Sequence, residues 1–282
     1  MRVYGVDFTC APRKAKPITI ASGSLKENIF RLEEVERLFT FADFEAFLER
    51  RGPWIGGFDL PFSLPRELVR DLKWPQTWRE LVQHCASLTR DDLRKAFDRY
   101  RASRPVGSKY VHRATDSPAG SSSPMKLVNP PVALMFHEGA PRLLAAGVHL
   151  PALCAGDRAR VALEAYPGLL VRKQLGLRAS YKSDTKRDQT PARRSVRRHV
   201  LDALLAGRPL GIRLSLSHSL KTDLLADGSA DRLDAAICAV QAAWAWQRRR
   251  SDFGLPRRRD PLEGWIVSVQ PDAGAFSRGS SR

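Results

Sequence analysis

The sequence predicts an α/β protein with a mixed central sheet flanked by helices and a mostly helical insertion. Short apolar runs near the N-terminus have the length and spacing of a three-stranded meander. A long stretch of helical periodicity and polar loops then interrupts the strand pattern. Strand-like sequence returns after it, and the last strong pattern is a helix of small apolar residues.

Strands are expected where apolar, β-branched or aromatic residues form short runs between turn residues. We expect the meander first, then a buried strand after Gly52-Pro53, then a fifth strand that stops at Pro167-Gly168. A final strand is expected close to the C-terminus. The predicted strands are residues 3–8, 18–21, 29–32, 54–58, 161–166 and 264–268.

Helices are indicated by caps and by apolar spacing. Thr89 and Asp92 form a capping box ahead of an amphipathic run, and Thr190-Pro191 begins a helix that Gly207 ends. A longer apolar helix is expected over residues 229–247, where its small side chains indicate close packing against a sheet. The other predicted helices are shorter, at 41–50 and 169–175.

The predicted domain organisation is one domain over residues 1–268. Residues 66–150 are expected to be a mostly helical insertion, with a long polar loop at 104–131, and residues 269–282 a disordered tail. Hydrophobic residues make up 43% of the 282 residues, which is enough for a sizeable core. No run reaches the roughly 20 apolar residues of a membrane span, and we see no signal peptide, so we expect a cytoplasmic protein without a membrane partner.

The charge balance indicates a polyanionic partner. Lys and Arg number 47 against 30 Asp and Glu, a formal net charge of +17, which attracts nucleic acid over long range. A solvated basic surface without a partner is the alternative. The four cysteines and six histidines are dispersed, which argues against a zinc module or disulfide framework and fits a reducing compartment. The sequence leaves the oligomeric state open.

Five acidic residues stand where structure alone does not ask for a charge. Asp7 and Asp59 follow apolar strands, and functional groups collect at the carboxyl ends of strands in open α/β sheets. Glu164 lies inside the fifth strand. Asp231 and Asp234 begin the last helix, about 60° apart around its axis, so both carboxylates can face one point.

Each acid also has an ordinary structural explanation. Asp7 could cap a turn, Asp59 could form an Asx-turn before Pro61, and Glu164 could pair with an arginine. The two aspartates of the last helix could simply favour the positive end of the helix dipole. Their coincidence at one predicted edge of the sheet favours a shared site.

At these positions the chain resembles a known family. Tyr4-Gly5-Val6-Asp7, the segment 56–62, Leu163-Glu164-Ala165-Tyr166-Pro167 and the segment 231–239 are similar to an uncharacterised domain-of-unknown-function family of predicted RNase H-like nucleases. The likeness spans residues 3–268. The segment 231–239 also resembles the final helix of Holliday-junction resolvases of that fold, in which two aspartates three residues apart bind metal.

The resemblance implies an RNase H-like fold and a two-metal-type nuclease. Two Mg²⁺ (or Mn²⁺) ions held by carboxylates can activate water and stabilise the leaving oxygen. By this likeness Asp7, Asp59 and Asp234 are metal ligands. Asp231 or Glu164 supports one ion, although the usual motif assigns no acid to the fifth strand.

Basic residues would then hold the substrate. Arg113 and Lys126 of the long loop, Lys182 and Lys186 of a basic stretch, and Arg194 of the following helix are the candidate phosphate contacts. No base-reading motif is present, so DNA and RNA are not distinguished. The main alternative is a catalytically inactive RNase H-like module that binds nucleic acid or protein. A phosphotransferase of the actin-like branch is a third reading, but the chain lacks its glycine-rich phosphate loop after the first strand.

Overall fold

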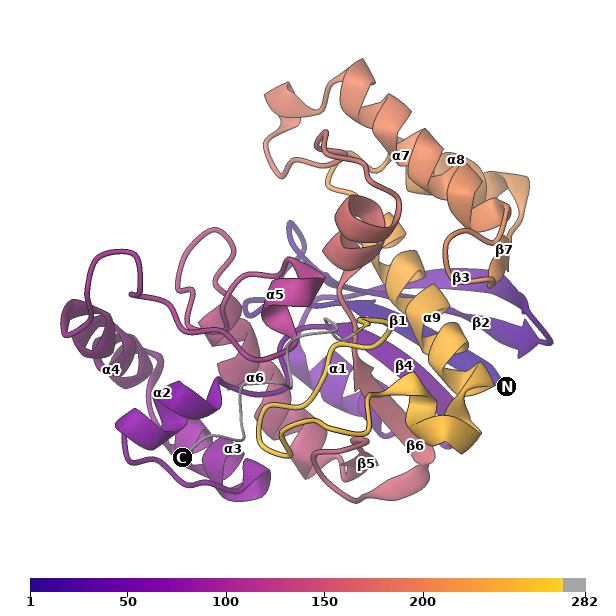
Figure 1. The fold of residues 1–282 in the computed structure, drawn as a ribbon. Coiled ribbons are helices and arrows are strands. Elements are labelled where there is room, and N and C mark those ends of the chain that lie inside the picture. Colours follow the sequence, from indigo (N-terminus) through magenta and orange to yellow (C-terminus); the bar gives the residue numbers. More distant parts are fainter. Residues whose placement is uncertain (271–282) are drawn as a thin grey trace.

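One mixed sheet organises the computed structural model, which describes residues 1–270; in that part of the chain seven strands follow the order β5-β6-β4-β1-β2-β3-β7 (Figure 1). The first three strands form an antiparallel meander, and β4 and β6 run parallel to β1. The predicted α/β fold class with a mixed central sheet is confirmed. The strands are β1 (Arg2–Asp7), β2 (Ile18–Lys26), β3 (Ile29–Leu38), β4 (Trp54–Asp59), β5 (Val148–His149), β6 (Asp157–Glu164) and β7 (Arg213–Ser215).

Helix α9 (Asp231–Gln247) crosses one face of the sheet (Figure 1), and glycines let it lie close. A Cβ atom at Gly5 would overlap the backbone of Ala235, and one at Gly57 would overlap the backbone of Cys238. The missing side chains on the strands and the small residues of α9 therefore bring the two backbones into contact. Helices α7 (Pro191–Leu205) and α8 (His218–Ala226) pack on the same side, in one core with α9.

The opposite face carries an aromatic core. Phe44 and Phe47 of α1 (Phe41–Leu48) pack against Tyr4 and Phe58 of the sheet. Four helices of the segment between β4 and β5 enlarge this core: α2 (Arg66–Asp71), α3 (Trp78–Ser87), α4 (Arg90–Ala102) and α6 (Val132–Ala145). The short helix α5 (Asp116–Ala119) packs instead in a small separate core, through Ala119. The sheet thus lies between two helical layers.

The local sequence signals succeed where a cap defines an element. Thr89 and Asp92 make the predicted capping box of α4, and Thr190 caps α7 with Pro191 in its first turn. Residues 169–174 form the helix η1 (Leu169–Gln174), close to the predicted 169–175. The polar loop 104–131 contains the single short helix α5. Two further short helices are η2 (Lys186–Asp188) and η3 (Arg249–Gly254).

The predicted strand at 264–268 is wrong. The segment is buried, but it makes isolated contacts in place of a strand ladder: the amide of Val267 donates to the carbonyl of Glu164 and that of Ile266 to the hydroxyl of Thr115. Its apolar residues fill a small core with Leu169, so burial alone explains the pattern. Val269 is also buried, beyond the expected end of the domain, and residues 271–282 of the predicted tail lie outside the described residues.

Candidate functional site

Two of the predicted acids meet at the carboxyl ends of adjacent parallel strands. Asp7 ends β1 and Asp59 ends β4, and the two are paired in register. Since side chains alternate along a strand, both point to the face of the sheet covered by α9, as Gly5 and Gly57 do. Asp7 is buried, with 8% of its surface exposed, and Asp59 is partly buried.

The beginning of α9 adds the other two aspartates. Asp227 fixes this end of the helix, because its carboxylate accepts from the amides of Ser229 and Arg232. Asp234 is fully buried and Asp231 nearly so. The charges of both aspartates act on Asp7, and that of Asp234 also acts on Asp59. The structure therefore brings Asp7, Asp59, Asp231 and Asp234 into one cluster.

A cleft of about 730 Å³ opens onto this cluster. Asp7, Asp59 and Asp231 line it, and segments far apart in the sequence form its walls. Cavities of this size accommodate a ligand as large as a nucleotide. Its basic lining residues are Lys16, Arg113, Lys126, Arg172 and Lys182.

Asp7 and Asp59 have uncompensated carboxylates. Within residues 1–270 neither side chain accepts a hydrogen bond or forms an ion pair. Burial raises the pKa of Asp7 well above its ordinary value, and the charges of Asp231 and Asp234 raise it further. Burial likewise raises the pKa of Asp59 to about 7 against the pull of Lys182. A bound cation would stabilise the ionised form of both carboxylates.

Two lysines already supply positive charge to the cluster. Lys182 pairs with Asp234, whose other oxygen accepts from the Tyr181 hydroxyl at 2.6 Å. Lys16 reaches Asp231 at 2.8 Å and Asp184 at 2.9 Å. Burial opposes the charge on both lysines, but the neighbouring carboxylates raise the pKa of each, so both ammonium groups remain protonated.

These ion pairs bear on metal binding. Among residues 1–270, no three His, Cys, Asp or Glu side chains are arranged to hold a metal ion as they stand. Both oxygens of Asp234 are occupied by Tyr181 and Lys182. The donor types suit a hard cation, and the carboxylates of Asp7 and Asp59 are free, but Asp234 can join them only when Lys182 moves away.

Glu164 lines the same cleft, and its charge helps to raise the pKa of Asp59, but it lies on the other face of the sheet from the four aspartates. It is paired in register with Phe58, one residue before Asp59, so strand alternation turns its side chain to the opposite face of the sheet. Its carboxylate accepts from the amide of Phe62 and from both terminal nitrogens of Arg113, which also pairs with Asp116. Burial raises the pKa of Glu164 although Arg113 opposes this. Of the explanations considered for Glu164, the arginine pair is the one observed.

Arg113 is correspondingly engaged and 2% exposed. It lines the cleft, but Glu164 and Asp116 occupy its guanidinium group, so it has little capacity left for a phosphate. The ion pairs of Arg113 with Asp116 and Glu164, called the Arg113 clamp below, connect the loop at 104–131 to β6. Glu263 strengthens this connection by accepting from the amides of Ala114 and Arg66. The wall of the cleft is therefore preformed.

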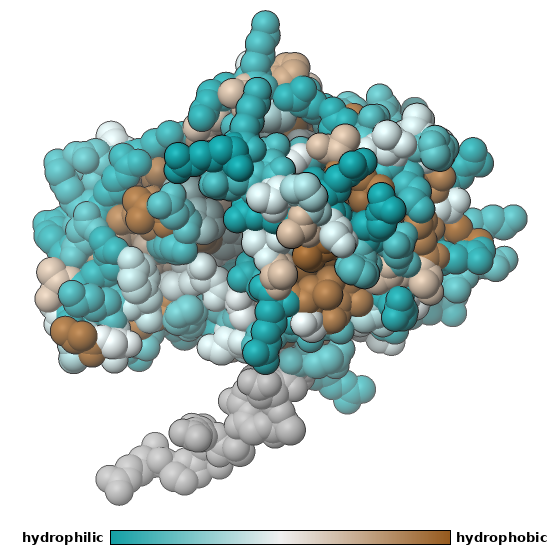
Figure 2. Space-filling model, turned by 90° about the horizontal axis from the view of Figure 1, so that it is seen from above, coloured by the Kyte–Doolittle hydropathy of each residue, from teal (hydrophilic) through white to brown (hydrophobic). Residues whose placement is uncertain are grey.

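The other predicted basic contacts divide into two groups. Lys126 and Lys182 line the cleft, whereas Lys186 and Arg194 are exposed outside its lining. Neighbours of Arg194 have a structural role: Arg197 donates to the carbonyl of Tyr181 and Arg193 to that of Lys182. The molecule seen from above is mostly hydrophilic, with hydrophobic side chains in separate groups (Figure 2).

Sequence reasoning missed three cleft residues, Lys16, Tyr166 and Arg172. Lys16 follows the first strand in an irregular segment and meets α9 only in the folded chain. Tyr166 stood within the predicted fifth strand, where an aromatic residue is ordinary. Of the three, only Arg172 could have been found from the sequence, because it is a cation in the short helix that directly follows that strand.

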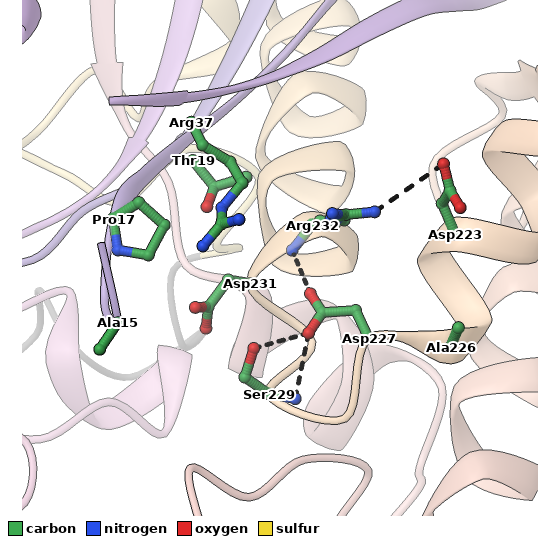
Figure 3. A pocket seen from close by; sticks show the side chains of 10 residues that line it. All are labelled: Ala15, Pro17, Thr19, Arg37, Asp223, Ala226, Asp227, Ser229, Asp231 and Arg232. Carbon is green, nitrogen blue, oxygen red and sulfur yellow. Dashed lines mark hydrogen bonds and ion pairs between the residues drawn. The ribbon is translucent and has the colours of Figure 1, made fainter. Parts of the chain in front are cut away.

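A second cavity, of about 320 Å³, adjoins the cluster at Asp231 (Figure 3). Its three acids, Asp223, Asp227 and Asp231, oppose the guanidinium groups of Arg37 and Arg232. The close-up shows Asp227 bound at the start of α9 and Asp223 paired with Arg232. The acids outnumber the arginines in this cavity, so its lining has no surplus of positive charge for an anion.

No helix in residues 1–270 is long and apolar enough to cross a membrane. Searches of curated proteins and of solved structures each found no match to the chain. The family described as "Protein of unknown function (DUF429)" matches residues 5–256, a span that includes all the aspartates of the cluster. The chain therefore belongs to this family of unknown function.

Proposed function

We propose that the protein is a metal-dependent nuclease of the RNase H-like type that hydrolyses phosphodiester bonds in the cleft. The observation that carries this proposal is the in-register pair Asp7 and Asp59, two uncompensated carboxylates at the floor of a cleft with basic walls. A cation below and a phosphate above would satisfy both signs of charge.

The sheet supports the RNase H-like interpretation. That interpretation requires a three-stranded meander, then two neighbouring strands at about 54–58 and 161–166, and one continuous helix near the C-terminus packed on the sheet. The strand order β3-β2-β1-β4-β6 and the close contact of α9 with β1 meet these requirements. This likeness in topology supports the nuclease proposal but does not by itself assign the chemistry.

Asp7, Asp59 and Asp234 would hold Mg²⁺ or Mn²⁺, with Asp231 as a supporting ligand. When bound, such an ion polarises a phosphoryl oxygen and lowers the pKa of a coordinated water. Lysine side chains of the protein would supply the remaining roles in the site. Lys16 keeps Asp231 oriented through their ion pair, and Lys182 would exchange Asp234 for a substrate phosphate.

One observation favours the alternative of an inactive module that binds nucleic acid or protein. Lys182 pairs with Asp234 and Lys16 with Asp231, so two of the four aspartates already have cationic partners. A module that needs no metal would retain these pairs permanently. A nuclease would release at least the Lys182 pair when it binds metal and substrate.

The test is metal-dependent cleavage of single-stranded and duplex DNA and RNA oligonucleotides by the purified chain. We expect hydrolysis with Mg²⁺ or Mn²⁺, none in EDTA, and none by Asp7→Asn, which keeps the size of the side chain but removes its charge. Asp98→Asn is the matched control, because Asp98 is exposed on α4 and, within residues 1–270, its one ion pair is with Arg101. Equal rates for wild type and Asp7→Asn would refute the mechanism. No cleavage of any substrate together with no Mg²⁺ binding would favour the inactive module.

A further inference from the structure

We infer that the cleft takes an unpaired nucleotide of a single strand, with its base against Tyr166 and its phosphate at Lys126 and Arg172. This inference rests on the proposed function and names its substrate class. It has three grounds: the unpartnered cations of the cleft, its apolar wall, and the depth of the carboxylates.

Two cations of the cleft have no acidic partner. Within residues 1–270, neither Lys126 nor Arg172 forms an ion pair, although most cationic groups near the cluster do. In that part of the chain, the Arg172 side chain makes only a long hydrogen bond of 3.4 Å to the Tyr166 hydroxyl. Both groups can therefore bind a phosphate without first breaking an ion pair.

The same cleft has an apolar and aromatic wall. Tyr166 lines it beside Arg172; its hydroxyl donates a hydrogen bond of 3.5 Å to the carbonyl of Gly120, and its partly buried ring packs against the small core that includes Leu169. Pro131, Val132 and Met135, from the start of α6, also line the cleft and are only partly buried. An aromatic ring next to positive charge is the combination that binds single-stranded nucleic acid, because bases stack on the ring while cations hold the backbone.

The depth of the cluster argues against a paired substrate. Asp7 is 8% exposed and Asp234 is fully buried, so the reacting phosphodiester must descend into the cleft. Base-paired DNA is stiff and cannot fold into a cavity of about 730 Å³. An unpaired nucleotide can enter, as in enzymes that act on single strands or on flipped nucleotides. The Arg113 clamp holds the loop wall in place for such a ligand.

The experiment measures binding without cleavage, using the full-length wild-type chain in EDTA. Fluorescence anisotropy compares a labelled, 5′-phosphorylated single strand with a blunt duplex of the same sequence at one salt concentration. We expect the single strand to bind at least about tenfold more tightly. Removing the bases from the single strand should weaken binding at least about fivefold, the lower limit for loss of one stacking contact.

Variants assign the contacts. Tyr166→Leu should weaken single-strand binding at least about fivefold, whereas Tyr166→Phe, which keeps the ring, should not. Lys126→Ala and Arg172→Ala should each weaken it and reduce its salt dependence. Lys95→Ala is the control, because Lys95 is exposed and pairs with Asp91 on α4.

Equal affinity for duplex and single strand, or equal binding of the abasic strand, would overturn the inference. So would equal losses in the two Tyr166 variants. These outcomes are independent of the nuclease proposal. Cleavage with a preference for duplex would refute the unpaired nucleotide alone, and tight single-strand binding without cleavage would refute the nuclease alone.

Discussion

Replacing Asp59 by Asn should stabilise the metal-free protein, and the gain should depend on pH. The pKa of Asp59 rises from an ordinary 3.8 to about 7, mainly because the carboxyl group is buried. A pKa difference of about 3 corresponds to about 4 kcal/mol, which is the upper limit of what ionised Asp59 costs the native state. Asn has the same shape and no charge.

The sign follows from proton binding. Between about pH 4 and about pH 7 the native state holds the Asp59 proton more tightly than the unfolded chain does, so the free energy of unfolding falls as the pH rises. Below this window both states are protonated and Asp59 has no electrostatic cost. Above it the full cost is present, and Lys16 and Lys182 stay charged because their pKa values are raised.

Urea denaturation at several pH values in EDTA measures the difference. We expect the unfolding free energy of Asp59→Asn, relative to wild type, to increase by at least about 1 kcal/mol and at most about 4 kcal/mol from pH 4 to pH 8. Asp98→Asn, on the exposed face of α4, serves as the control and should show no such trend. A pH-dependent difference below about 0.5 kcal/mol, the usual effect of a surface substitution, would refute the assignment of Asp59 as a partly buried, uncompensated carboxylate.

Three further predictions concern the cluster and its clamp. Mg²⁺ at about 100 times its Kd should raise the unfolding free energy of the wild type by about 2.7 kcal/mol and that of Asp7→Asn by much less. Thermal melts with and without EDTA measure this difference, and equal gains for both proteins would mean that the ion binds elsewhere. Lys182→Met should destabilise the metal-free protein by about 1 to 3 kcal/mol, because Asp234 loses its cation, and Mg²⁺ should restore part of this; an unchanged Tm would contradict the pairing. Glu164→Gln should lower the unfolding free energy by about 3 kcal/mol, because Arg113 stays buried without full compensation of its charge. The double variant with Arg113→Met should lose less stability than the sum of the two single losses. Additive losses in urea denaturation would exclude the clamp.

Some features follow from the sequence because they depend on neighbouring residues. The cap at Thr89 and the start of α7 at Thr190-Pro191 satisfy backbone amides a few residues away, so a short pattern is enough to identify them. The strand-ending positions of Asp7 and Asp59 are equally local, and parallel strands must bring such ends to one edge of the sheet.

The alternation of side chains along a strand bears on the placement of Glu164. The sequence groups Glu164 with the other acids because it is a charge inside an apolar strand, but its register with Phe58 turns it to the other face. The rule of alternation was available from the sequence, whereas the register was not. A shift of one residue reverses the face, and register depends on the pairing of strands about 100 residues apart.

The ionic partners were decided only by the tertiary structure. Arg113 and Lys182 are both cations in polar segments. Arg113 pairs with two buried carboxylates, whereas Lys182 pairs with the buried Asp234 near the start of α9. Likewise residues 264–268 have the apolar pattern of a strand but pack as a loop, because burial does not require a strand ladder. The sequence alone determined the fold class, the capped helices and the candidate acids, since these depend on local hydrogen bonds and apolar spacing. Which charges meet depends on long-range contacts, and those exist only once the sheet, α9 and the insertion have come together.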